Sequence, residues 1–319
     1  MTNYELKPIE TNGVTLETVV EGDGPLVILL HGWPQCWYLW RHQIQPIVEA
    51  GYRVAVPNQR GYGGSSAPQD SEAYNVRELA ADVVGLSQAL GYDEFTLIGH
   101  DWGCIAAWNT ALLHSDTCTA IMGLSVPFWR FPADYCDPPQ DGFWYARLFQ
   151  TPGLAEADLE ADLYGSLAGI YYGLGAQAPA GTFLNQINFP ATASFRDVFP
   201  PPAELPPWLT EDDLRVYVSE YEKSGFFGPN SWYRNIPRMV EITPEIDGAR
   251  FTRPAAFAAG RQDVALMIND DWRTEFEKSF DDLRFIEIID DAGHWVQMEQ
   301  PAKTNAAILR FLASLSAKQ

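Results

Sequence analysis

The chain has 319 residues, of which 46% are hydrophobic, 13% aromatic and 20% charged, and its formal net charge is −21. Nucleic acids and anionic membrane surfaces bind clusters of Lys and Arg, so this charge excludes both as partners. The composition is typical of a globular protein, and the length suits an α/β domain that carries an insertion.

The sequence also predicts the cellular compartment of the protein and the absence of disulfides, metal sites and cofactors. The N-terminal stretch MTNYELKPIETNG has no basic region followed by an apolar one, and no run of 18 apolar residues occurs, so we expect a soluble, cytoplasmic protein. The four cysteines lack CxxC spacing. We therefore expect reduced thiols, no metal site and no cofactor.

Short apolar runs alternate with helical patterns over the first 126 residues. The alternating stretch at 14–20 predicts a strand of an antiparallel edge hairpin. Buried strands are predicted at 25–30, 52–57, 94–99 and 118–126, and helices at 37–50, 76–90 and 102–113. This order predicts an α/β fold with a mostly parallel sheet flanked by helices.

Residues 127–247 interrupt the alternation. They hold most of the prolines and helical patterns at 155–172 and 211–224, but no run typical of a buried strand. Thr210 and Asp213 have the spacing of a capping box at the start of the second helix. We expect this segment to be an inserted helical cap, or lid, subdomain.

The α/β pattern returns after the insertion. The predicted elements are strands at 254–260 and 284–290 and helices at 270–279 and 302–315. Residues 1–126 and 248–319 are therefore expected to form the core domain together.

The pentapeptide Gly99-His100-Asp101-Trp102-Gly103 has the spacing of a nucleophile elbow, a sharp strand-to-helix turn that exposes its central side chain. Here that side chain is Asp101 in place of the usual Ser. An aspartate suits attack on a saturated carbon, because it gives an alkyl ester that water can hydrolyse. A helix N-cap is the alternative interpretation of Asp101.

Hydrolysis of such an ester requires a base. His294 lies between a predicted strand and the last predicted helix, where this kind of site places its histidine. Asp263 follows the strand at 254–260 and is the best-placed carboxylate to orient His294. Asp290 and Asp291 lie too close to His294 along the chain to be preferred.

The loop His31-Gly32-Trp33-Pro34 follows the strand at 25–30 and is expected to approach the elbow. The backbone N–H groups of Trp33 and Trp102 are the predicted oxyanion hole, with roughly 3 kcal/mol of stabilisation from each donor. Because an X-Pro bond can be cis at low cost, a cis peptide at Trp33-Pro34 is allowed.

These residues resemble the soluble epoxide hydrolase family of the α/β-hydrolase fold. The likeness covers nearly the whole chain, because the stretches HGWPQCWYLWRHQI, PNQRGYGGSS and GHDWG, the insertion from Pro127 and DAGHWVQMEQP occur in the order of that family. The resemblance implies hydrolysis of a small apolar epoxide to a vicinal diol. It implies an ester on Asp101, with His294 and Asp263 activating the water.

The same resemblance implies two cap tyrosines that protonate the epoxide oxygen. GFWYARLFQTPG is similar to the family segment that carries the first, which is Tyr145 here, and SGFFGPNSWYRN to the segment that carries the second, Tyr233. A phenol with a pKa of about 10 can donate a proton to the alkoxide that forms when the ring opens.

An apolar tunnel between cap and core is expected to hold the substrate. Trp33 and Trp102 are expected among its walls, and the further predicted substrate-binding residues are His31, Pro34, Trp144 and Phe189. Trp33 and Gln35 depart from the residues common in the family, and the Ala- and Pro-rich stretch 176–207 has no clear counterpart. The natural epoxide, the regio- and enantioselectivity and the oligomeric state, a homodimer included, stay open.

Two other functions compete with this interpretation. A haloalkane or haloacid dehalogenase also uses an aspartate nucleophile, with Trp102 as a halide donor, but it does not need the tyrosine pair. A non-catalytic binding protein on the same fold is the second alternative, because a fold does not fix a function. An esterase is disfavoured because the elbow lacks Ser.

Overall fold

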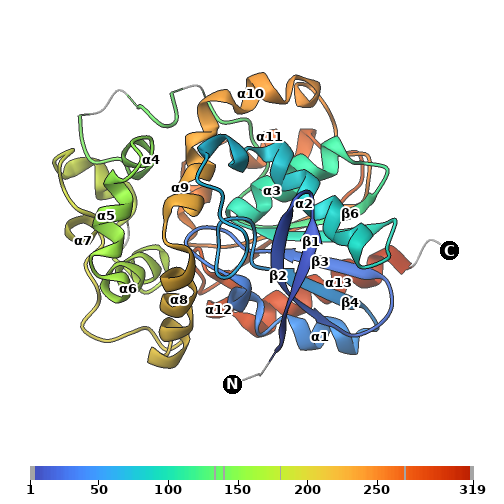
Figure 1. Cartoon of the computed structure of the whole chain (residues 1–319). Coiled ribbons are helices and arrows are strands. Elements are labelled where there is room, and N and C mark those ends of the chain that lie inside the picture. The colour runs from blue at the N-terminus through green and yellow to red at the C-terminus, as the bar shows by residue number, and fades with distance from the viewer. Residues whose placement is uncertain (1–3, 133, 139–140, 180, 269–270, 317–319) are drawn as a thin grey trace.

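The computed structural model describes residues 4–132, 134–138, 141–179, 181–268 and 271–316. Within these ranges the chain forms an eight-stranded sheet in the order β1-β2-β4-β3-β5-β6-β7-β8 (Figure 1). The strands are β1 (Leu6–Thr11), β2 (Val14–Glu21), β3 (Leu26–Leu30), β4 (Arg53–Pro57), β5 (Phe95–His100), β6 (Cys118–Leu124), β7 (Ala255–Gly260) and β8 (Leu283–Ile289).

Most of the sheet is parallel, as the alternation of strands and helices predicts. Strands β3 to β8 pair in parallel, while β1 pairs antiparallel with β2 and β2 antiparallel with β4. Every residue of β3, β5 and β7 is buried. These strands read as continuous apolar runs because helices cover both faces of the sheet.

The core helices lie in two layers. Figure 1 shows α2 (Val76–Ala89), α3 (Trp102–Leu113) and α11 (Trp272–Lys278) on one face of the sheet, and α1 (Ile44–Glu49), α12 (Val296–Glu299) and α13 (Pro301–Ser316) on the other. The predicted helix at 37–50 is wrong in its first part. Residues Trp37–Trp40 form a 3₁₀ turn, and α1 begins at Ile44, since Pro46 has no N–H and fits only in the first turn of a helix.

The chain between β6 and β7 is helical. Its helices are α4 (Tyr145–Phe149), α5 (Leu154–Glu160), α6 (Leu163–Leu174), α7 (Phe195–Val198), α8 (Glu211–Ser224), α9 (Phe227–Arg234) and α10 (Met239–Ile242). Figure 1 shows α4 to α7 to one side of the molecule, with α8 and α9 between them and the sheet. The described part of this segment contains no strand, apart from an isolated bridge between Gly142 and Pro190.

Two helix predictions in this segment have different outcomes. The single helix expected at 155–172 is two helices, because Asp162 caps a new one by accepting a hydrogen bond from the N–H of Gly165. The predicted capping box of α8 is confirmed: Asp213 N–H donates to Thr210 Oγ1 at 3.1 Å, and Thr210 N–H to Asp213 Oδ2 at 3.0 Å.

The remaining predicted elements lie close to their expected bounds. Residue 270, at the start of the helix expected at 270–279, lies outside the described residues, and α11 begins at Trp272. None of the helices in the described ranges combines the length and the apolar character that a bilayer crossing requires.

Candidate active site

Asp101 stands at the apex of a tight turn between β5 and α3. Its backbone has φ 54° and ψ −122°, a conformation that L residues rarely adopt. Glycines at both ends make the turn feasible. A Cβ on Gly99 would lie 2.3 Å from the carbonyl oxygen of Gly103, and one on Gly103 would lie 2.1 Å from that of Leu30. The elbow geometry predicted from the pentapeptide is present.

The loop after β3 contacts the Asp101 side chain directly. A Cβ on Gly32 would lie 2.4 Å from the Cβ of Asp101, so only glycine permits this approach. The Trp33 N–H donates to Asp101 Oδ1 at 2.7 Å, and the Trp33-Pro34 peptide is cis. Trp102, the second predicted donor, begins α3, and in the described part of the chain its N–H makes no hydrogen bond to the carboxylate.

His294 lies between two carboxylates. Its Nε2 is 3.5 Å from Asp101 Oδ2, and its Nδ1 is 3.0 Å from Asp263 Oδ1. Asp263 follows β7 and is itself fixed by the N–H of Ala265, which donates to Oδ1 at 3.0 Å. The three predicted residues therefore form a continuous chain of polar contacts, although they lie far apart in the sequence.

The charges around His294 determine its proton affinity. Burial on its own lowers the pKa of His294, but the carboxylates of Asp263 and Asp101 outweigh it and raise the pKa from 6.5 to about 10. For the carboxyl group of Asp263 burial has the opposite effect and raises the pKa. The charge and the hydrogen bond of His294 outweigh burial, so the pKa of Asp263 lies below its usual value. In the resting site the imidazole is thus cationic and paired.

Glu299, at the end of α12, holds the loop that carries His294. Its carboxylate accepts hydrogen bonds from the N–H groups of Gly293 and Trp295 at 3.0 Å, and from that of Ala176 at 2.8 Å. Burial raises the pKa of Glu299, and these bonds oppose the rise. A second support is His100, whose Nε2–H donates to the carbonyl of His294 at 2.8 Å. No motif in the sequence indicated this role of Glu299.

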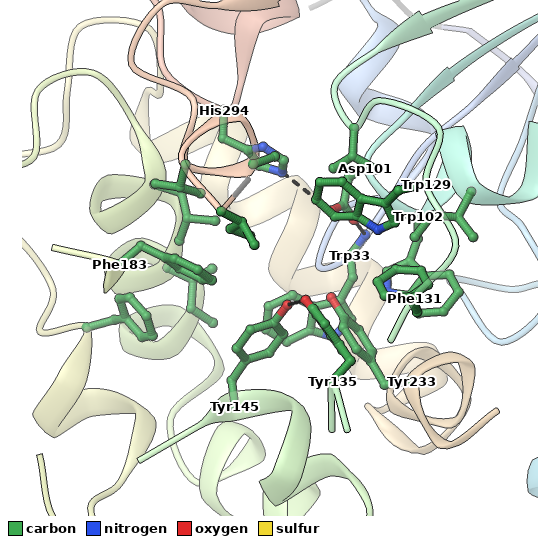
Figure 2. Close-up of a pocket in the computed structure, with 18 of the residues that line it drawn as sticks. Trp33, Asp101, Trp102, Trp129, Phe131, Tyr135, Tyr145, Phe183, Tyr233 and His294 are labelled. Carbon is green, nitrogen blue, oxygen red and sulfur yellow. Dashed lines mark hydrogen bonds and ion pairs between the residues drawn. The ribbon is translucent and has the colours of Figure 1, made fainter. Parts of the chain in front are cut away.

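A largely apolar cavity opens above Asp101 and His294. Figure 2 shows the hydroxyl oxygens of Tyr135, Tyr145 and Tyr233 gathered on the side of the cavity away from His294. The other lining residues are Trp33, Trp102, Ile105, Val126, Trp129, Phe131, Ile170, Leu174, Phe183, Phe195, Phe199, Val264, Ala265 and Ile268. Such walls can bind an apolar molecule that has one oxygen atom to accept hydrogen bonds from the tyrosine hydroxyls.

The two predicted tyrosines come from separate helices. Tyr145 begins α4 and Tyr233 lies in α9, and their ring centroids are 5.5 Å apart. Burial is the main cause that raises the pKa of both well above the usual value of 10. Both phenols are therefore protonated at neutral pH and can donate hydrogen bonds into the cavity.

The four further residues predicted to bind substrate do not line this cavity. His31 is fully buried, accepts a hydrogen bond from the Gln59 N–H at 3.1 Å, and supports the loop. The Pro34 carbonyl accepts a hydrogen bond from the Tyr171 hydroxyl at 2.8 Å. The Trp144 indole donates to the Tyr135 carbonyl at 2.7 Å. These contacts stabilise the loop after β3 and the segment between β6 and β7, and they do not face the cavity.

Phe189 also lies off the cavity wall, where its carbonyl accepts the N–H of Phe143 at 2.9 Å. Three phenylalanines of the Ala- and Pro-rich stretch 176–207 line the cavity, and the sequence analysis did not identify them: Phe183, Phe195 and Phe199. Among the residues that the structure describes, no three His, Cys, Asp or Glu side chains are grouped so as to hold a metal ion.

Comparisons with known proteins give the family. A family model described as alpha/beta hydrolase fold matches residues 25–301. Epoxide hydrolase A of Mycobacterium tuberculosis is 38% identical over 317 residues, which cover 96% of this chain and 97% of that relative. The chain belongs to the epoxide hydrolases.

Solved epoxide hydrolase structures agree with this assignment. An epoxide hydrolase from an endophytic Streptomyces superposes with a TM-score of 0.94 at 37% identity and covers 99% of this chain and 97% of its own. Epoxide hydrolase A from Mycobacterium thermoresistibile has a TM-score of 0.89 at 41% identity, with 98% of each chain covered. The α/β-hydrolase fold of this chain is therefore that of the epoxide hydrolases.

The pKa of His294 predicts a pH-dependent stability. A histidine with a raised pKa in the folded state stabilises the fold fully below its unfolded pKa of 6.5, and this stabilisation is lost as the pH rises toward about 10. We expect the difference in melting temperature between the wild type and His294→Gln to shrink from pH 6 to pH 10. In an Asp263→Asn background this difference should depend less on pH, because the charge of Asp263 is the main cause that raises the pKa of His294. A difference that grows with pH would contradict the assignment.

Proposed function

We propose that this chain hydrolyses small apolar epoxides to vicinal diols through a covalent ester on Asp101. The observation that carries the proposal is the arrangement of Asp101 and His294 on one side of an apolar cavity and of Tyr145 and Tyr233 on another (Figure 2). The names of its relatives support the same reaction. In this proposal residues 1–126 and 248–319 are the core domain and 127–247 the cap.

In the first step the Asp101 carboxylate attacks a ring carbon of the epoxide. Oδ1 accepts the Trp33 N–H, so Oδ2, the oxygen nearer to His294, is the attacking atom. The electron pair of the broken C–O bond moves to the epoxide oxygen. Tyr145 and Tyr233 donate to this oxygen, because an alkoxide is costly in an apolar cavity.

In the second step His294 activates a water molecule. Once Asp101 is an ester it has lost its negative charge, so one of the two carboxylates that raise the pKa of His294 is gone. The imidazole can then lose its proton and act as a base, while Asp263 orients it. Water attacks the ester carbonyl, and the oxyanion that forms on Oδ1 is stabilised by the Trp33 N–H. The predicted second donor is Trp102.

Two features favour an epoxide over a haloalkane. The developing charge in ring opening stays on the substrate and needs acidic O–H donors, which the tyrosine pair supplies. A dehalogenase usually has a second halide-binding Asn or Trp besides Trp102, and the indole N–H of Trp33 is instead engaged by Asn230 Oδ1 at 3.1 Å. Incubation with styrene oxide and, separately, with a bromoalkane discriminates an epoxide hydrolase from a dehalogenase and from a binding protein.

Removal of the cap donors tests the epoxide assignment. We expect Tyr145→Phe and Tyr233→Phe each to slow ring opening by about 10²-fold, because one donor remains in each variant. The double variant should lose nearly all activity while its fold survives. Diol formation from styrene oxide by gas chromatography measures the rate, and circular dichroism checks the fold. Activity near the wild-type level in the double variant would remove the assignment.

Removal of the base tests the two-step mechanism. His294→Gln keeps the nucleophile and the tyrosines, so the ring should open and the ester should then persist. The intact mass of the protein is expected to rise by the mass of one substrate molecule. Asp101→Asn serves as the control and should show no added mass. An unchanged mass in His294→Gln would count against the covalent route.

An isotope experiment separates the covalent route from direct hydration of the epoxide. In the covalent route water attacks the ester carbonyl, so the oxygen from the solvent remains on Asp101 after the first turnover. With excess enzyme in heavy-oxygen water, we expect mostly unlabelled diol and a labelled peptide that contains Asp101. Mass spectrometry of both products reads the outcome. Label found wholly in the diol would exclude the covalent ester.

A further inference from the structure

A third hydroxyl lies next to the proposed proton donors. The hydroxyl oxygen of Tyr135 is 2.7 Å from that of Tyr145, and Figure 2 shows both pointing to the same part of the cavity. We propose that Tyr135 is a positioning residue for ring opening, which acts by donating a hydrogen bond to the phenolic oxygen of Tyr145. This inference rests on the proposed function.

The surroundings of Tyr135 fix its hydroxyl in place. The Tyr135 carbonyl accepts the indole N–H of Trp144 at 2.7 Å, and its ring packs edge-on against Phe131 at 4.8 Å and Trp144 at 5.7 Å. Phe131 in turn stacks on Trp102, directly after the nucleophile, at 6.2 Å. Tyr135 is therefore held from its backbone and its ring, with its hydroxyl toward Tyr145.

The direction of the hydrogen bond follows from the number of protons. Each phenol has one proton, so if Tyr145 donated to Tyr135 it would have none for the epoxide oxygen. The developing alkoxide is a far stronger acceptor than a neutral phenol. When substrate is bound, the favoured arrangement is Tyr135 to Tyr145 to the epoxide oxygen.

The same arrangement balances the protons over the cycle. As the Asp101–carbon bond forms and the epoxide C–O bond breaks, the epoxide oxygen takes the proton of Tyr145. The Tyr145 phenolate then accepts the Tyr135 hydrogen bond, which is stronger to a charged oxygen than to a neutral one. The proton that His294 gives up after ester formation neutralises the Tyr145 phenolate. In the second step the hydrolytic water gives one proton to His294, which restores the imidazolium, and the other to the leaving diol oxygen.

The proposal makes the two catalytic donors unequal. Tyr233 packs against the Trp102 ring at 4.9 Å, and no tyrosine hydroxyl is hydrogen-bonded to it within the described ranges. Burial raises the pKa of Tyr135 above its usual value, so this phenol keeps its proton at neutral pH and can donate throughout the cycle. Tyr145 therefore has a second phenol as its hydrogen-bond partner. At Tyr233 burial raises the pKa, and a hydrogen bond with the Trp102 side chain opposes this rise.

A double-mutant cycle tests the inference. Tyr135→Phe deletes one oxygen and keeps the ring packing, and we expect it to slow single-turnover alkylation of Asp101 by styrene oxide about tenfold. Hydrolysis of the preformed ester should be unchanged, a selectivity that a general structural defect would not show. In a Tyr145→Phe background the same change should have no further effect, because Tyr135 acts through Tyr145.

The matched control is Tyr221→Phe. Tyr221 is a buried tyrosine whose hydroxyl has no hydrogen-bond partner among the described residues, so its loss should leave both steps unchanged. Quenched intact-mass measurements follow formation and decay of the ester in each variant.

Several results would overturn the inference, and they are distinguishable from failure of the proposed function. An unchanged alkylation rate in Tyr135→Phe, an equal loss in both steps, or a loss that is fully additive with Tyr145→Phe would each remove the role of Tyr135 alone. If Tyr145→Phe itself left alkylation unchanged, the proposed proton donor would fail, and the role of Tyr135 with it.

Discussion

The backbone at Asp101 must hold φ 54° and ψ −122° for the site to exist. Such a conformation costs on the order of 1–3 kcal/mol for a residue with a side chain, and it persists only where the surroundings enforce it. Here the enforcement comes from close packing: Gly99 lets β5 approach α3, and Gly103 lets α3 approach the end of β3. Gly32 lets the loop after β3 contact the Asp101 side chain. The carboxylate thereby faces the cavity at the edge of the sheet, where the Trp33 N–H holds it.

Trp33 joins this turn to the cap. Its backbone donates to Asp101, while its indole N–H donates to Asn230 of α9 and its ring lies 5.1 Å from that of Phe149 and 6.0 Å from that of Tyr233. The Tyr171 hydroxyl donates to the next residue, Pro34. One loop therefore fixes both sides of the cavity, so the distance between Asp101 and the tyrosines depends on how the helices between β6 and β7 pack on Trp33.

The electrostatics of the site are local and do not follow from the net charge of the chain. His294 is buried between Asp101 and Asp263, and its loop is tied down by the buried Glu299. A histidine that is paired on both sides cannot serve as a base at neutral pH. In the proposed cycle, formation of the ester removes one of the two charges, so the first chemical step produces the base that the second step needs.

The sequence by itself determined the parts that depend on neighbours along the chain. It predicted the buried strands to within one or two residues, the bounds of α3 and α8, and the elbow, because the periodicity of apolar residues and the glycine spacing are local. It could not find the break at Asp162, and it placed Trp144 and Phe189 on the cavity wall. Only the tertiary structure decided that Phe183 lines the cavity, that Glu299 reaches Ala176, 123 positions away, and that Tyr135 meets Tyr145. These contacts depend on how the segment between β6 and β7 packs on the sheet, and no local pattern encodes that packing.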